Sequence, residues 1–158
     1  MNQLEIKIKV KVFGNLKELT SADAALMQAA KAALDNSYSP YSSFKVAAAV
    51  LLENGEILTG TNQENASYPV GICAEGTVLS AVSAVYPNVA VKKMAVTVKS
   101  GRKLVAQPVA PCGICRQRIL EYEMRFNSNI AIIMMGEEGE VYSVNTIKDL
   151  LPLAFFKI

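Results

Sequence analysis

The chain has 158 residues, of which 51% are hydrophobic and 19% are charged. This length fits one domain, and so large an apolar share excludes a wholly disordered protein. The 16 basic and 14 acidic residues leave a net charge of +2 without a polybasic block, which argues against a dedicated nucleic-acid surface.

The apolar runs are too short to cross a membrane. One of the longest, residues 46–52, has seven residues, whereas a spanning helix needs roughly 18 or more. The N-terminus alternates lysine with aliphatic residues and lacks the continuous apolar stretch of a secretory signal. The sequence therefore predicts a cytoplasmic protein with no membrane partner.

Residues 4–13 alternate between apolar and charged side chains, which predicts a strand with one solvated face. Lysines on that face are typical of a protected sheet edge, and this interpretation is favoured over a membrane or nucleic-acid role. Thr20 is then placed to cap a helix, with Asp23 three residues later as in a capping box. This helix should end near Asn36 and bury one face, formed by Leu26, Met27, Ala30, Ala33 and Leu34.

The central part of the chain predicts a hairpin followed by a helix and a strand. Asn54-Gly55 is a strong turn signal between strands at 46–52 and 57–62, after a serine- and proline-rich loop at 37–43. An apolar stripe over 73–85 predicts a helix that Pro87 stops, and residues 94–98 predict the next strand.

The C-terminal third predicts one more long helix and two strands. The helix begins near Gly113 and should carry Ile114, Ile119 and Leu120 inward. Strands follow at 130–135 and 141–144, and Asn145 or Thr146 can cap a short final helix through Leu151. Alternating strands and helices after a hairpin indicate an α/β fold, a three-layer α/β/α sandwich with a mixed central sheet.

Three cysteines lie at the starts of two predicted helices. Cys73 opens the first helix, and Cys112 and Cys115 open the second in a C-x-x-C pattern. Amides in the first turn of a helix favour thiolates, so this placement suits either metal or redox chemistry. A thioredoxin-like disulfide would explain Cys112 and Cys115 without Cys73, which would then be a buried structural cysteine.

The number of available ligands favours a zinc site with one open position over a site closed by four protein ligands. A structural zinc site takes four cysteine or histidine ligands, and this chain has three cysteines and no histidine. Water would fill the fourth position, and zinc lowers the pKa of such a water to about 7. Glu75, two residues after Cys73, is placed to accept its proton. The plain alternative for Glu75 is a favourable interaction with the helix dipole.

The segments Cys73-Ala74-Glu75 and 111–117 (PCGICRQ) resemble the signature of the small zinc-dependent cytidine deaminases, of the three-cysteine, homotetrameric type. Residues 39–46, 61–68 and 150–155 agree with further blocks of that family in the same order. The resemblance implies a single cytidine-deaminase-like domain over 1–158. Residues 1–20 would add an extra N-terminal strand and connection, with residues 4–13 outside the resemblance.

The resemblance also implies a reaction. Cys73, Cys112 and Cys115 would hold one zinc ion per subunit. Glu75 would carry a proton from the zinc-bound water to the pyrimidine ring and then to the departing ammonia. The implied activity is hydrolytic deamination of cytidine and deoxycytidine to uridine and deoxyuridine, in pyrimidine salvage.

Substrate contacts follow from the same resemblance. Asn62 and Glu64 match residues that hydrogen-bond the ribose hydroxyls, and the backbone near Ala74 and Cys112 would hold the edge of the base. Phe44 would pack against the base. Taken singly, Phe44 reads as core, and Asn62 and Glu64 as the end of a hairpin strand.

Two further aromatic residues imply an oligomer. Phe155 matches an aromatic residue that the family lends from a neighbouring subunit, and Tyr68 matches an intersubunit contact. Their plain alternatives are a core position and an ordinary interface. The hypothesis is a homotetramer, in which each active site borrows residues from a neighbour.

Two positions depart from the family pattern. Gly76 stands where the family commonly has arginine, and zinc with three thiolates carries a formal charge of 2 minus 3, or −1. The helix N-termini offset part of this charge, and Arg116 or Arg118 is placed to approach the sulfurs. A rise in turnover in Gly76→Arg would indicate an undercompensated site. Ala47 stands where the family often has glycine, and its methyl group either narrows the pocket or packs in the core.

Four other functions remain open from the sequence. The same site could deaminate another aminopyrimidine nucleoside, or the chain could be a catalytically silent zinc- or nucleoside-binding homologue. A thiol oxidoreductase would use Cys112 and Cys115 and hold no zinc. Polynucleotide editing is least favoured, because no basic stripe with interleaved aromatic residues is found.

Overall fold

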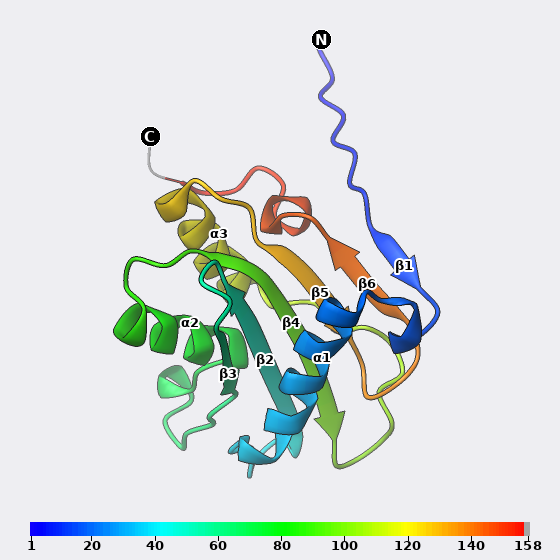
Figure 1. Cartoon of the computed structure of the whole chain (residues 1–158), viewed down its shortest axis with the longest axis vertical. Coiled ribbons are helices and arrows are strands. Elements are labelled where there is room, and N and C mark those ends of the chain that lie inside the picture. Colours follow the sequence, from blue (N-terminus) through cyan, green and yellow to red (C-terminus); the bar gives the residue numbers. More distant parts are fainter. Residues whose placement is uncertain (157–158) are drawn as a thin grey trace.

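The computed structural model describes residues 1–156, which form a six-stranded mixed sheet with helices on both faces (Figure 1). The strands are β1 (Lys11–Phe13), β2 (Phe44–Leu52), β3 (Ile57–Thr61), β4 (Val91–Ser100), β5 (Ala131–Met135) and β6 (Val141–Val144). The helices are α1 (Ser21–Ala33), α2 (Ala74–Val85) and α3 (Gly113–Phe126), with 3-10 turns η1 (Leu16–Glu18), η2 (Leu34–Asn36), η3 (Tyr68–Val70) and η4 (Ile147–Leu150). The strand order is β1-β6-β5-β4-β2-β3; β4 and β5 are parallel, and the other neighbours are antiparallel.

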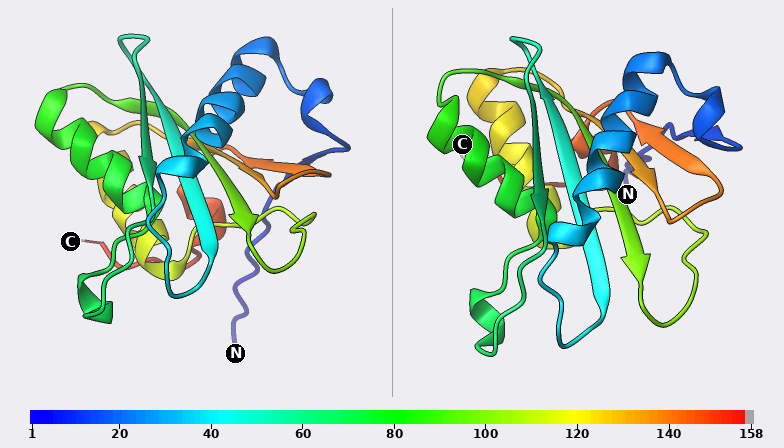
Figure 2. Two further views of the ribbon diagram at one scale, coloured as in Figure 1. Left: turned by 90° about the horizontal axis from the view of Figure 1, so that it is seen from below. Right: turned by 60° about the horizontal axis from the view of Figure 1, so that its bottom comes forward.

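The helices divide between the two faces of the sheet. Figure 2 shows α1 on one face, and α2 and α3 side by side on the other. Apolar side chains fill both interfaces, with Met27 and Ala49 on the α1 side and Leu79 and Ile119 on the other. This arrangement confirms the predicted three-layer α/β/α sandwich. Within residues 1–156, no helix has the length and apolarity that a membrane crossing requires.

Local signals in the sequence account for most element boundaries. The Thr20 hydroxyl accepts a hydrogen bond from the Asp23 amide at 3.2 Å and so caps α1, as predicted. Gly55 has a φ of +89° in the turn that joins β2 to β3, a conformation that favours glycine. Thr146 caps the final short turn, so the structure selects it over Asn145.

The predicted strand over residues 4–13 is wrong for most of its length. β1 covers Lys11–Phe13 alone, and the preceding residues run away from the sheet (Figure 1). Lys11 pairs with Ser143, one residue before β6 ends at Val144. Within residues 1–156, no strand pairs with the residues before β1, and an alternating pattern alone does not form a strand without a partner.

The predicted inward position of Ile114 is also wrong. Ile119 and Leu120 are buried as expected, whereas Ile114 is 78% exposed. Five residues separate Ile114 from Ile119, which corresponds to about 140° around the helix axis. Cys115 lies on the buried face in its place, because it precedes Ile119 by four residues.

Ala47 packs away from the candidate site. Its side chain is fully buried with Ala33 and Leu34, whereas Val46, the preceding residue, lines the cavity described below. Successive side chains of a strand point to opposite faces, so the extra methyl group at 47 belongs to the α1 layer. The structure thus favours packing over a narrowed pocket.

Candidate active site

Three sulfurs converge where α2 and α3 begin. Cys73 caps α2, Cys112 caps α3, and Cys115 is the third residue of α3. The three Sγ atoms lie within 4.8 Å of one another, and those of Cys73 and Cys112 are 3.9 Å apart. Zn–S bonds of about 2.3 Å at tetrahedral angles require about 3.8 Å between sulfurs, so the donor set fits zinc. A disulfide between Cys112 and Cys115 would not explain why Cys73 joins the cluster.

Close backbone packing brings the start of α2 to the sheet. A Cβ at Gly60 of β3 would lie 2.9 Å from the Ala74 carbonyl oxygen and 2.5 Å from the Val78 amide nitrogen. Real Cβ atoms do not approach backbone so closely, so glycine at 60 permits this contact. The first turn of α2, which follows Cys73, is therefore anchored directly against β3.

The thiols are electrostatically coupled. A hydrogen bond from the Cys115 thiol lowers the pKa of Cys73 to about 6, against the opposing effects of burial and of Glu75. The positive charge of Arg118 acts in the same direction as that hydrogen bond. The same hydrogen bond, together with burial, raises the pKa of Cys115. Cys73 thus forms a thiolate, the form that binds metal, more readily than Cys115 does.

Glu75 lies in the first turn of α2 and is 4% exposed. Burial raises the pKa of its carboxyl group, although its own backbone amide and the Cys115 thiol act in the opposite direction. A carboxyl group with a raised pKa can both take up and release a proton near neutral pH. Its place beside three sulfurs makes it a candidate general acid and base.

A cavity of about 570 Å³ opens onto this cluster, a volume within the range of small-molecule sites. Cys73, Cys112 and Glu75 line one part of it. The predicted substrate residues Phe44, Asn62, Glu64 and Tyr68 line the same cavity. The structure therefore brings together residues that lie up to 68 positions apart in the sequence.

Three predicted site residues lie outside the lining of this cavity. Ala74 and Cys115 are buried behind it. Phe155 is 82% exposed, and its carbonyl oxygen accepts a hydrogen bond from Gln117 Nε2 at 2.8 Å. Phe155 thus has no contact with the cavity of its own chain, so its borrowed role stays a prediction.

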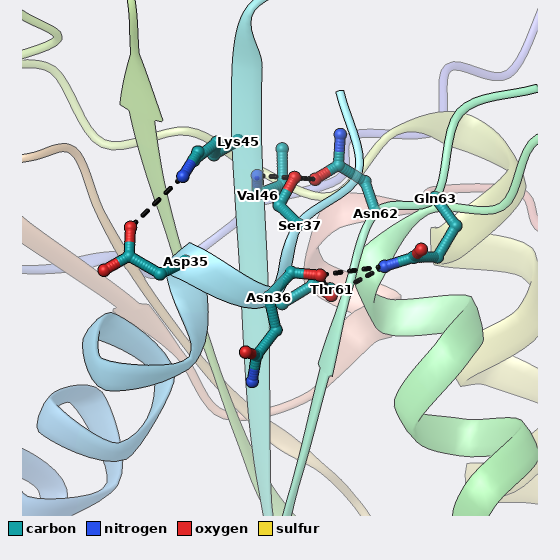
Figure 3. Close-up of polar contacts among 8 residues, drawn as sticks. All are labelled: Asp35, Asn36, Ser37, Lys45, Val46, Thr61, Asn62 and Gln63. Atoms are coloured by element: carbon teal, nitrogen blue, oxygen red, sulfur yellow. Dashed lines mark hydrogen bonds and ion pairs between the residues drawn. The ribbon is translucent and has the colours of Figure 1, made fainter. Parts of the chain in front are cut away.

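Asn62 joins the strand ends around the cavity (Figure 3). Its Oδ1 accepts hydrogen bonds from Ser37 Oγ at 2.6 Å and from the Val46 amide at 2.8 Å. Its Nδ2 donates to the Phe44 carbonyl at 2.9 Å. Both lone pairs of Oδ1 are therefore occupied, and one N–H remains for a ligand.

Glu64 holds the loop that precedes β2. Its Oε2 accepts from the Tyr41 amide at 2.8 Å and from the Ser42 amide at 3.3 Å. A hydrogen bond from the Ser42 side chain is the largest cause that lowers the pKa of the carboxyl group; the two amides act in the same direction, and desolvation opposes them. The amides of Tyr41 and Ser42 could not be predicted as partners of Glu64, because any residue type except proline supplies the same main-chain donor.

Comparisons with known proteins agree with this geometry. The profile of the family described as "Cytidine and deoxycytidylate deaminase zinc-binding region" matches residues 20–128. The chain is 37% identical to a cytidine deaminase of Sporosarcina psychrophila over 133 residues, which cover 84% of this chain and 90% of the relative. It is 35% identical to one from Halalkalibacterium halodurans over 130 residues, covering 82% and 91% of the two chains.

A solved structure gives the same result for the fold. The crystal structure of a cytidine deaminase from Burkholderia pseudomallei superposes with a TM-score of 0.72 at 36% identity. The match covers 87% of this chain and 100% of the other. The six strands and the flanking helices described above therefore correspond to an experimentally determined architecture.

Proposed function

The chain belongs to the family of zinc-binding cytidine and deoxycytidylate deaminases, and we propose that it hydrolyses cytidine and deoxycytidine to uridine and deoxyuridine with release of ammonia. The observation that carries the proposal is a buried carboxyl group, Glu75, which lines one cavity with Cys73 and Cys112 and lies beside the three converging sulfurs. Its place in the cell would be the cytoplasm, where thiols such as these three stay reduced. Its metabolic role would be pyrimidine salvage.

The three cysteines would hold the zinc ion. Cys73, Cys112 and Cys115 supply three ligands, the number typical of catalytic zinc sites, which keep a fourth position open. Zinc bound there supplies a nucleophile at neutral pH, because it lowers the pKa of a coordinated water to about 7. The first-turn amides of the two helices stabilise the thiolates that bind it.

Glu75 would move the protons of the reaction. Its carboxylate accepts a proton from the attacking water and passes it to the ring nitrogen beside C4 of the cytosine. A second proton from the new hydroxyl group goes through Glu75 to the amino nitrogen, which leaves as ammonia. Burial of Glu75 supports this role, since a carboxyl group with a raised pKa protonates more readily.

The other cavity residues would bind the nucleoside. The free Nδ2 hydrogen of Asn62 and the second carboxylate oxygen of Glu64 are suited to the ribose hydroxyls. Phe44 would stack against the base, and the backbone near Ala74 and Cys112 would hold its polar edge. The bonds that fix Asn62 also fix the Phe44 backbone, so both groups are positioned before substrate arrives.

We further propose a homotetramer in which a neighbouring subunit completes the cavity. Phe155 is 82% exposed and Tyr68, at the cavity edge, is 77% exposed, as suits residues covered in an assembly. Sedimentation at micromolar concentration is expected to give a tetrameric mass. A monomeric mass would remove the proposed role of Phe155.

The deciding experiment follows the ultraviolet absorbance as purified, zinc-loaded protein converts cytidine to uridine. Wild-type turnover that Glu75→Gln abolishes, at equal zinc content, would support both the activity and the role of Glu75. Absence of turnover in folded, zinc-containing protein would reject cytidine as substrate. The remaining candidates would then be another aminopyrimidine nucleoside and a silent binding homologue.

A further inference from the structure

The proposed metal site carries a negative charge that needs a partner. Three thiolates and one Zn²⁺ sum to −1, and the buried carboxylate of Glu75 adds to it when ionised. Uncompensated charge in a partly buried site costs free energy. A cation close to the sulfurs would therefore favour both the thiolates and the bound metal.

Arg116 and Arg118, both on α3 near the cysteines, are placed differently. Arg116 Nε donates to the Pro111 carbonyl oxygen and its Nη1 to the Leu150 carbonyl oxygen, each at 2.7 Å. These bonds tie the start of α3 to η4 and occupy two nitrogens of the guanidinium. Arg116 therefore serves the fold.

Arg118 reaches the other helix of the site. It follows Cys115 by three residues, and long side chains in helices extend back over the preceding turn. Because α2 and α3 lie side by side (Figures 1 and 2), this direction leads toward the first turn of α2. There its Nη1 occupies the space that a side chain on Gly76 would take, so closely that a Cβ at 76 would overlap it.

Gly76 leaves the space that the Arg118 guanidinium occupies. It is buried in the first turn of α2, three positions after Cys73, and a Cβ there would also lie 3.0 Å from Ile72 Cγ1. Its φ is not positive, so backbone conformation does not call for glycine here. Space for the guanidinium is the reason that the structure provides.

We propose that Arg118 is a positioning residue of the metal centre, its guanidinium seated over Gly76 to balance the charge of the three-thiolate site. This rests on the proposed function in that the three sulfurs are taken to hold zinc. Gly76 and Arg118 then act as a pair, since the glycine leaves the room that the arginine fills. A guanidinium could equally enter this space from position 76, provided that position 118 were small.

The first test measures zinc affinity by competition with a chelating indicator. Arg118→Gln removes the charge at similar size and is expected to weaken zinc binding roughly 10-fold or more, whereas Arg118→Lys should retain most of the affinity. Arg125→Gln is the matched control on the same helix, because Arg125 Nη2 bonds the distant Pro87 carbonyl at 2.6 Å. Wild-type affinity in Arg118→Gln would overturn the proposal.

The second test moves the arginine between the helices. Gly76→Arg alone places two guanidinium groups in one space and is expected to weaken zinc binding. Combining it with Arg118→Ala should restore affinity to within about threefold of wild type, a non-additive result that marks direct coupling. A double variant no better than Arg118→Ala would overturn the pairing, and thermal unfolding of each variant identifies those that fail to fold.

These tests are separate from the test of the proposed function. Zinc affinity is measured without any nucleoside, so it does not depend on cytidine being the substrate. If cytidine is not converted but Arg118→Gln still loses zinc, the proposed function fails and the role of Arg118 stands. If cytidine is converted and Arg118→Gln binds zinc normally, the role of Arg118 fails alone.

Discussion

The first turn of α2 and the last turn of α3 each bury a glutamate, and the surroundings of the two carboxyl groups differ. Glu75 is 4% exposed and Glu123 is 2% exposed. Glu123 accepts hydrogen bonds from the Ile130 amide at 2.8 Å, the Ile147 amide at 3.0 Å and the Thr146 hydroxyl at 2.7 Å. The Glu75 carboxyl group accepts hydrogen bonds from its own backbone amide and from the Cys115 thiol, and it lines the cavity.

The difference shows that burial alone does not identify a catalytic carboxyl group. Three donors offset the cost of burying Glu123, which thereby fastens the residues before β5 and the start of η4 to α3. Glu75 lacks such a set, so burial raises its pKa and leaves its proton exchangeable. The number of hydrogen-bond donors distinguishes the structural carboxyl group of Glu123 from that of Glu75, the proposed proton carrier.

The largest expected effect is on turnover in Glu75→Gln. Loss of the proton carrier should lower kcat by roughly 10²- to 10⁴-fold. The free energy of unfolding should stay equal or rise slightly, because the amide removes a buried ionisable group that few donors stabilise. Absorbance kinetics and chemical denaturation measure the two quantities. Retained turnover with a destabilised fold would place Glu75 in the structural class with Glu123.

The opposite result is expected for Glu123→Gln. An amide cannot accept all the hydrogen bonds that converge on the carboxylate, so the free energy of unfolding should fall by about 2 kcal/mol. The kcat of the folded fraction should stay near wild type. Glu121→Gln, exposed on the same helix, is the matched control and should leave stability unchanged. A loss of kcat in Glu123→Gln without a loss of stability would contradict the structural role of Glu123.

The sequence predicted that Cys73, Cys112, Cys115 and Glu75 belong to one site, whereas it gave no prediction for Glu123. Each of the former belongs to a short motif at a helix start, so local signals suffice. The donors to Glu123 lie 7 to 24 residues away, in elements that meet it through tertiary packing. The pairing of Arg118 with Gly76 likewise depends on how two helices pack.

The fold shows the same limit. The Thr20 cap and the Asn54-Gly55 turn predicted the start of α1 and the hairpin, because their causes are local, whereas α1 ends at Ala33 and a 3-10 turn continues to the predicted end at Asn36. The strand over 4–13 was wrong, because strand length depends on the partner, and β6 has four residues. Ile114 was misplaced because an apolar side chain in the first turn carries no information about which face is buried.

The smallest expected effect concerns Glu64, a third carboxyl group, at the cavity edge. Its hydrogen bonds hold its pKa below the ordinary value of 4.5. A depressed pKa means that the ionised form persists as the pH falls to 4.5, and its contribution is lost only below that, through the folded pKa. The KM for cytidine should therefore stay constant between pH 5 and pH 8 as far as Glu64 is concerned.

Substitution of Glu64 sharpens this expectation. Glu64→Gln should raise the KM for cytidine roughly fivefold at every pH in that window, with a smaller change in kcat, because a charged acceptor for ribose is lost. Glu56→Gln, exposed on the hairpin, is the control and should leave KM unchanged. A KM effect in Glu64→Gln that disappears toward pH 5 would mean that the wild-type carboxyl group already becomes protonated there, which would contradict its lowered pKa. The hydrogen bonds from Tyr41 and Ser42 would then not be what sets the pKa of Glu64.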